Sequence, residues 1–219
     1  MPARMSSKQL GETDLTVTSI CMGGSLLGSM PAVFGYEYSQ EQAIATVSAV
    51  FLSPINFLDT AAGYSDGESE RRVGLAIQRA GGLPPGFVLA SKADPDPVTG
   101  DFSGDQVARC AEASLGRLGV GSLPLYYLHD PENISFGFAM ARGCPVERLL
   151  QLKEEGVVGA IGVAGGPIDL LERYVRTDAF DVVLTHNRFT LLEQAAEPLI
   201  ALAVDRGIGV VNAAPFGGG

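Results

Sequence analysis

Three residues with ionisable side chains stand where short apolar runs of the chain end. Asp59 closes the run Asn-Phe-Leu-Asp, Lys92 closes Val-Leu-Ala-Ser-Lys, and His129 closes Tyr-Tyr-Leu-His. Tyr64 follows shortly after Asp59. The chain has only three lysines and two histidines, so chance rarely places one of each at consecutive run ends. A carboxylate, an ammonium, an imidazole and a phenol are groups that enzymes use to form ion pairs and to move protons.

Of the four residues, Lys92 most needs a partner of opposite charge, because an unpaired charge at the end of a buried strand is very costly. We expect Asp59, on the neighbouring strand, to be its partner. Taken singly, each residue has a simpler explanation: Asp59 could cap the following turn, and Lys92 could extend to solvent. His129 and Tyr64 could be ordinary packing residues. Found together at adjacent strand ends, the four favour a functional site.

The elements that must position these residues alternate along the chain. Short runs rich in Val, Ile and Leu, bounded by Gly, Pro or Asp, are typical of buried parallel strands. The expected strands are Thr18–Met22, Asn56–Ala61, Phe87–Lys92, Leu123–His129, Val158–Val163, Asp181–His186 and Gly207–Ala213. The expected helices are Gln40–Leu52, Glu68–Ala80, Gly104–Leu118, Val146–Glu155, Pro167–Val175 and Leu192–Asp205. About seven such units predict an eightfold barrel or a long open parallel sheet.

Local signals refine this prediction. Ser39 is a plausible helix N-cap, and Gly81 follows a helical run as a stop signal. The opening segment 8–18 predicts a hairpin that turns at Gly11–Asp14 and could close the floor of a barrel. The run Met22-Gly-Gly-Ser-Leu-Leu-Gly lacks the Gly-x-Gly-x-x-Gly spacing, which disfavours a Rossmann domain.

Composition restricts the partners. Lys plus Arg total 15 against 25 Asp plus Glu, and a net charge of −10 repels the phosphates of nucleic acids. The three cysteines, Cys21, Cys110 and Cys144, lack metal-ligand spacing, so we expect reduced, buried thiols and no metal site. The sequence has neither the ~18 consecutive apolar residues of a membrane span nor a signal-peptide core at its start. A cytoplasmic protein, monomeric or a small homo-oligomer, is the expectation.

The run Asp59-Thr-Ala-Ala-Gly-Tyr64, followed by Ser-Lys92 and Leu-His129-Asp, resembles the catalytic tetrad of the aldo-keto reductase superfamily. The similarity covers essentially the whole chain, from the opening hairpin to the closing Ala-Pro-Phe. The segments 187–192 and 212–216 look most like the bacterial branch of D-threo-aldose (L-fucose) and L-galactose 1-dehydrogenases and pyridoxal 4-dehydrogenases. The resemblance implies an α/β fold, a (β/α)8 TIM barrel with an N-terminal β-hairpin, in which residues 1–219 form one domain.

The resemblance also implies roles and a cofactor. Tyr64 would be the general acid in reduction and the base in oxidation. Lys92 would lower the pKa of the phenol from its usual value near ~10, and Asp59 would hold Lys92 charged. His129 would hydrogen-bond the substrate oxygen. NADP or NAD would carry the hydride, and the substrate would be a sugar or an aldehyde. The residues expected to contact the cofactor are Gly23, Gly24, Asp59, Asn187, Ala213, Ala214 and Phe216.

The chain departs from the family pattern at two places. Ala164 and Gly165 stand where the family often has a Ser-Asn pair that grips the nicotinamide carboxamide, and His186 or Asn187 could compensate. Ala213 stands where a tyrosine often stacks on the nicotinamide. We expect Phe216 to cover the ring or the loop instead.

The chain ends just past the seventh expected strand, so we expect the last βα unit to be absent from it and the barrel to be C-terminally incomplete. The choice between NAD and NADP therefore stays open. Two loops on the expected catalytic face carry polar residues that either bind sugar hydroxyls or are simply solvated: Asp94, Asp96, Asp101, Glu132 and Asn133.

Two other functions remain open. A regulatory subunit of the same fold would bind the cofactor with little turnover. A barrel lyase would form a Schiff base on Lys92.

Overall fold

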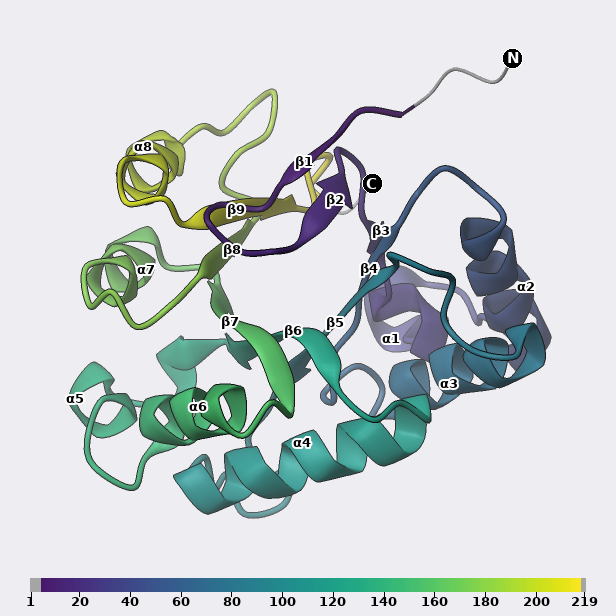
Figure 1. Ribbon diagram of the computed structural model, residues 1–219, viewed down its shortest axis with the longest axis horizontal. Helices are drawn as coiled ribbons and strands as arrows, with labels where there is room; N and C mark the ends of the chain where they lie inside the picture. The colour runs from purple at the N-terminus through teal and green to yellow at the C-terminus, as the bar shows by residue number, and fades with distance from the viewer. Residues whose placement is uncertain (1–4, 218–219) are drawn as a thin grey trace.

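Parallel strands follow one another around a nearly closed barrel, and helices cover their outer side (Figure 1). The computed structural model describes residues 5–217. The barrel strands are β3 (Met22–Gly23), β4 (Phe57–Asp59), β5 (Val88–Ala93), β6 (Leu123–His129), β7 (Val158–Gly165), β8 (Val182–His186) and β9 (Gly209–Ala213). They pair in chain order, and within residues 5–217 the first and last strands each pair on one side only. The barrel fold predicted from the sequence is confirmed.

The helices are α1 (Pro31–Phe34), α2 (Gln40–Phe51), α3 (Glu68–Ala80), α4 (Gly104–Leu118), α5 (Phe136–Ala139), α6 (Pro145–Glu154), α7 (Ile168–Val175) and α8 (Glu197–Asp205). Two 3₁₀ turns, η1 (Ser25–Gly28) and η2 (Pro131–Asn133), follow β3 and β6. The Ser39 side chain accepts the Gln42 amide and the Gln42 side chain accepts the Ser39 amide, which forms a capping box at α2. Gly81 ends α3 in the left-handed conformation, as predicted.

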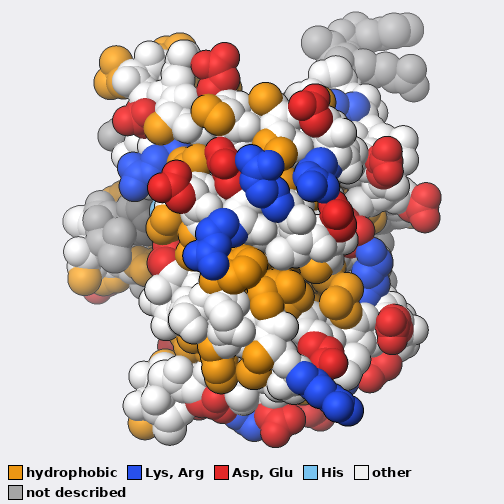
Figure 2. Space-filling model, turned by 90° about the vertical axis from the view of Figure 1, so that its left-hand side faces the viewer, with side chains coloured by type: hydrophobic (Ala, Val, Ile, Leu, Met, Phe, Trp, Pro, Cys, Tyr) orange, Lys and Arg blue, Asp and Glu red, His pale blue; other side chains and the backbone are white. Residues whose placement is uncertain are grey.

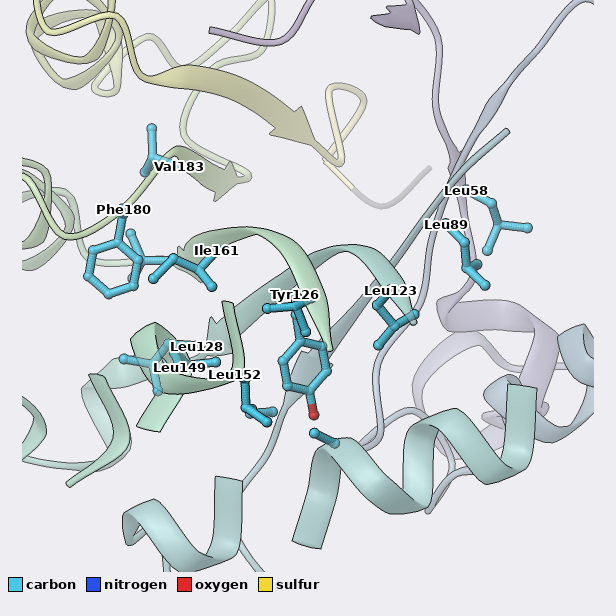
Figure 3. Close-up of a cluster of buried hydrophobic side chains, with 14 of the residues drawn as sticks. Leu58, Leu89, Leu123, Tyr126, Leu128, Leu149, Leu152, Ile161, Phe180 and Val183 are labelled. Carbon is cyan, nitrogen blue, oxygen red and sulfur yellow. The ribbon is translucent and has the colours of Figure 1, made fainter. Parts of the chain in front are cut away.

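Alternation along the strands separates two apolar layers. Side chains that point outward pack under the helices, and Figure 3 shows Tyr126 of β6 there, with Leu149 and Leu152 of α6. Side chains that point inward fill the barrel, among them Phe57, Val88 and Tyr127. Because successive residues of a strand face opposite sides, every second residue lines the barrel interior.

A hairpin closes one end of the barrel. Its strands are β1 (Ser7–Gln9) and β2 (Thr16–Thr18), paired antiparallel. Leu10 and Val17 are 3% and 4% exposed and belong to the inner apolar cluster. The amide of Glu12 donates to the carbonyl of Gly207 at 2.8 Å, next to the start of β9. The predicted hairpin over the barrel floor is confirmed.

Two expected elements were wrong in their bounds. The run Thr18–Met22 is not one strand, because Thr18 ends β2 and Met22 begins β3. The helix expected from Leu192 begins only at Glu197. The cysteines also differ from expectation: all three are free, but only Cys110 is buried, whereas Cys21 and Cys144 are partly exposed.

The outer surface mixes charge types. On the face where α5, α7 and α8 lie, hydrophobic side chains form a band between acidic and basic ones (Figure 2). Among the described side chains of this face there is no continuous basic surface of the kind that nucleic acids require. None of the helices described is long and apolar enough to cross a membrane.

Candidate active site

Three neighbouring strands carry the candidate residues on one face. Asp59 follows the inward-facing Phe57 by two positions on β4, Lys92 follows Ala90 on β5, and His129 follows Tyr127 on β6. The parallel register pairs Asp59 with Ala90 and Lys92 with Tyr127. On each next strand the polar residue therefore lies two positions beyond the residue that pairs with the polar residue of the previous strand. The side chains that line the barrel interior are therefore apolar along the strands and polar at the carboxyl ends of these three strands.

The ammonium of Lys92 is the centre of this group. Its side chain is 1% exposed, and Nζ donates to Asp59 Oδ1 at 2.5 Å, to the Thr60 carbonyl at 2.7 Å and to the Tyr64 hydroxyl at 3.1 Å. An ammonium has three donors, and all three are used. Because Tyr64 accepts from Lys92, the hydroxyl proton of Tyr64 stays free for another acceptor.

The charges around Lys92 shift two pKa values. Burial alone would lower the pKa of Lys92, but the nearby Asp59 and Tyr64 outweigh it and raise this pKa above its usual value. Burial raises the pKa of the Tyr64 phenol above its usual value, and Lys92 offsets this only in part. Lys92 thus acts in the predicted direction and lowers this pKa, but desolvation of the phenolate is the larger effect, so the net shift is upward.

His129 lies beside Tyr64. The two rings meet edge to face, with centroids 5.7 Å apart. The Nδ1 atom of His129 lies 2.6 Å from Asp94 Oδ1, and its Nε2 atom lies 3.8 Å from Asp130 Oδ1. The structure thus brings all four predicted catalytic residues together and adds Asp94 to them.

Asp94 was expected either to bind sugar hydroxyls or to be solvated, and its contacts differ from those of the two other loop aspartates, Asp96 and Asp101. Asp96 accepts the amides of Val98 and Thr99, and Asp101 accepts the amide of Ser103. These two carboxylates are satisfied within their own loop, which favours the solvated-loop interpretation for them. Of these three aspartates, only Asp94 contacts one of the four candidate residues, His129.

The predicted cofactor residues form two groups at the same end of the barrel. On one side, the amide of Gly24 donates to the carbonyl of Asp59 at 2.7 Å, and Gly23 pairs with Asp59 in register. On the other side, the amide of Asn187 donates to the carbonyl of Ala213 at 3.3 Å. The latter group sits on a constrained backbone, since Asn187 and Ala214 both have positive φ values, 58° and 50°. Phe216 is 82% exposed.

Glycines at the end of β7 leave room for His186. A Cβ atom on Gly166 would lie 3.2 Å from the ring of His186, and one on Gly165 would lie 2.9 Å from Glu132. Of the two residues at the Ser-Asn position, Gly165 thus lies against Glu132, while His186 lies against the next residue, Gly166. That His186 or Asn187 compensates for the missing pair stays a prediction.

Two further features lie near the site. Asp130, Glu132 and His186 bring one ligand atom each within 4.8 Å of one another. Sequence spacing does not reveal this group, because Asp130 and Glu132 follow β6 whereas His186 ends β8. The absence of a metal site stays a prediction. Acidic groups at an exposed rim often gather without an ion, and we assign this cluster no role. A cavity of about 360 Å³ lies beside Asp94, but none of the four tetrad residues lines it.

The comparisons with known proteins agree with this geometry. The model of the Aldo/keto reductase family matches residues 19–219. An L-galactose dehydrogenase from Arabidopsis thaliana is 30% identical over 217 residues, covering 97% of this chain and 66% of that protein. A D-threo-aldose 1-dehydrogenase from a Pseudomonas species is 31% identical over 206 residues, covering 83% of this chain and 61% of that protein.

A solved structure gives the same result for the fold. A Pseudomonas aeruginosa protein assigned to the aldo-keto reductases superposes with a TM-score of 0.77 at 26% identity, covering 94% of this chain and 77% of that one. The chain spans 66% and 61% of the lengths of the two curated relatives. Since the family model matches nearly all of its residues, the chain belongs to the aldo/keto reductase family.

Proposed function

We propose that this protein is an oxidoreductase that transfers a hydride between NAD or NADP and a substrate carbon, either C1 of an aldose or another aldehyde or alcohol carbon. One observation carries the proposal: a fully buried ammonium, Lys92, bridges Asp59 and the hydroxyl of Tyr64. Such an arrangement stabilises a phenolate, and a phenolate is what a tyrosine becomes when it has given up a proton.

Tyr64 transfers the proton in this mechanism. In reduction its hydroxyl donates a proton to the substrate oxygen, and Lys92 stabilises the phenolate that remains. In oxidation the phenolate oxygen takes the proton of the substrate hydroxyl. The raised pKa of Tyr64 keeps the phenol protonated at neutral pH, so the resting site is ready to act as an acid. His129, beside the Tyr64 ring, hydrogen-bonds the same substrate oxygen and fixes its direction.

The residues around the site fit a nicotinamide cofactor, which when bound would supply or accept the hydride. Among the described residues, Asp59 Oδ2 is a buried acceptor without a hydrogen-bond partner. A buried acceptor needs a donor, and a ribose hydroxyl or a carboxamide N–H would satisfy it. Gly23 borders open space in which a donor could approach Asp59. We keep as proposed contacts the residues that the family resemblance implies: Gly23, Gly24, Asp59, Asn187, Ala213, Ala214 and Phe216.

Two relatives act on sugars by their names, which supports an aldose as the substrate class. The chain covers only part of each, so the activity is proposed for the whole protein that contains these residues. We further propose that residues 1–219 belong to one barrel domain and that the protein is cytoplasmic. Its partner is a small molecule, with neither nucleic acid nor membrane involved.

The alternatives predict different chemistry at Lys92. A Schiff base requires a neutral amine, whereas Asp59 and Tyr64 raise the pKa of Lys92 and so favour the charged form. This speaks against the lyase. A regulatory subunit would keep the cofactor site without turnover, and the intact set of Asp59, Tyr64, Lys92 and His129 favours the enzyme over it.

The test compares wild-type protein with Tyr64→Phe and with Tyr36→Phe as a matched control, because Tyr36 is 51% exposed and is not one of the four tetrad residues. Nicotinamide absorbance is followed with NAD⁺ or NADP⁺ and with L-galactose, L-fucose, D-arabinose or pyridoxal. We expect substrate-dependent reduction of one cofactor, lost by about 100-fold or more in Tyr64→Phe and retained in Tyr36→Phe. Full activity in Tyr64→Phe would refute the mechanism. Cofactor binding without turnover in wild type would favour the regulatory subunit.

A further inference from the structure

The strongest interaction of His129 is with a carboxylate that the tetrad does not include. Asp94 Oδ1 lies 2.6 Å from His129 Nδ1, and the two side chains are 15% and 12% exposed. The second oxygen, Oδ2, accepts the backbone amide of Gly63 at 2.6 Å. Gly63 directly precedes Tyr64 in the chain. One carboxylate therefore contacts both His129 and the backbone that carries Tyr64.

The backbone of Asp94 is itself held in place. Its amide donates to the sulfur of Cys110 at 3.5 Å, and its carbonyl accepts from the Gln106 side chain at 3.4 Å. Both partners belong to α4. Asp94 also follows Lys92 by two residues, directly after the last residue of β5. The carboxylate thus projects from a position fixed by a barrel strand and by the helix behind it.

These contacts decide which nitrogen of His129 carries a proton. An ionised carboxylate can only accept hydrogen bonds, so the Nδ1 atom that faces it must be the donor. The Nε2 atom is then left for another partner. When the ring is neutral, Nε2 can accept from a substrate hydroxyl; when the ring is protonated, Nε2 can donate to a substrate carbonyl. The same orientation of His129 serves both directions of the reaction.

We propose that Asp94 is a positioning residue for the hydride-transfer site, which fixes the tautomer of His129 with its proton on Nδ1 and ties His129 to the Tyr64 loop. The inference rests on the proposed function, because it assumes that Tyr64 and His129 meet one substrate oxygen. It gives this Asp a role that neither a sugar-binding nor a solvated-loop interpretation contains.

The Asp94→Asn variant tests the proposal because it keeps the size of the side chain. The backbone N–H of Gly63 can only donate a hydrogen bond, so the side-chain oxygen of the new Asn is expected to face it. The amide NH₂ then faces His129 Nδ1, which can accept only if the proton moves to Nε2. Asp105→Asn is the matched control, since Asp105 is an exposed aspartate at the start of α4 and its loss removes the same charge.

The first readout is the ¹⁵N NMR pattern of the histidine rings in the 219-residue chain, which needs neither cofactor nor substrate. The chain has two histidines, so a His186→Gln version assigns the signals. We expect His129 to be protonated at Nδ1 in wild type and in Asp105→Asn, and at Nε2 in Asp94→Asn. A wild-type ring protonated at Nε2 alone, or an unchanged pattern in Asp94→Asn, would overturn the proposal.

The second readout is the kinetics of the same variants. We expect kcat of Asp94→Asn to fall about 100-fold while KM for the cofactor stays unchanged, because a misdirected catalytic group costs rate rather than cofactor binding. Unchanged kcat together with a changed tautomer would also overturn the positioning role. Failure of the proposed function shows separately, as activity that survives Tyr64→Phe, whatever the NMR pattern is.

Discussion

The phenol of Tyr64 is subject to two opposing influences. Burial disfavours its charged form, while the ammonium of Lys92, 3.1 Å from the hydroxyl, favours it. Burial is the larger effect, so the pKa of Tyr64 is raised above 10 and the neutral phenol predominates at neutral pH. A site in this state is suited to give a proton and must lose one before it can act as a base.

The two directions of the reaction should therefore respond differently to pH. Oxidation requires the phenolate, so its kcat/KM, which reports the free enzyme, should keep rising with pH through about 10. Reduction requires the phenol, so its kcat/KM should stay level at neutral pH and fall only above about 10. Rates measured in both directions across this range, with protein stability checked at each pH, give the answer. An oxidation rate that already levels off near neutral pH would contradict the raised pKa.

At the scale of elements, a second buried charged residue, Glu70, connects the strand that carries Lys92 to the helices outside it. Glu70 of α3 is fully buried, and it accepts from Ser91 of β5 at 2.5 Å and from Arg117 of α4 at 2.6 Å. Ser91 directly precedes Lys92, so this carboxylate fixes the outer side of the strand whose next residue faces the active site. Glu70 thus links α3 to both β5 and α4.

Arg117→Met should therefore be costly. It leaves the carboxylate of Glu70 buried without its cation, which we expect to destabilise the fold by about 3 kcal/mol. This is the lower end of the range for a broken buried pair, because Arg117 itself is 31% exposed. Urea unfolding measures the change. Arg79→Met, an exposed position on the same α3, is the control and should alter stability by less than about 0.5 kcal/mol. Similar small effects in both variants would contradict the account.

Elements with local signals could be predicted from the sequence. The bounds of α3 and α4 agree with their predicted ranges, because apolar periodicity and signals such as the stop at Gly81 act within a few residues. The strand ends at Asp59, Lys92 and His129 were equally visible, because a charged or polar residue interrupts each apolar run. The residues of the candidate site could therefore be predicted from the sequence alone.

Elements that depend on distant partners could not be predicted. The run expected as one strand turns at Thr18, whose amide donates to the side chain of Asn56, far along the chain. The helix expected from Leu192 starts late, because the hydroxyl of Thr190 accepts the amides of Leu192 and Glu193 and competes with helix formation. The contact between Asp94 and His129 is of the same kind, since only the packed barrel brings the two together.

At the scale of the whole molecule, the N-terminal hairpin meets the start of the last described strand, β9, on the barrel floor. The hairpin between β1 and β2 places its turn against the start of β9. Gly11, with φ of 60°, lies so close that a Cβ atom would be 2.3 Å from the amide nitrogen of Gly209. The amide of the next residue, Glu12, donates to the carbonyl of Gly207. The hairpin is therefore part of the barrel rather than an appendage, and its docking should contribute to stability.

Gly11→Ala tests this docking against Gly100→Ala. Both glycines have positive φ, 60° and 72°, but nothing lies within 4 Å of a Cβ atom on Gly100. Both variants should lose about 1–2 kcal/mol from the left-handed backbone. Gly11→Ala should lose a further ~1–3 kcal/mol because the new methyl group meets the backbone of β9. Urea unfolding measures both, and hydrogen exchange of the Glu12 amide should quicken only in Gly11→Ala. Equal losses and an unchanged Glu12 amide would mean that the hairpin folds against the barrel too loosely to stabilise it.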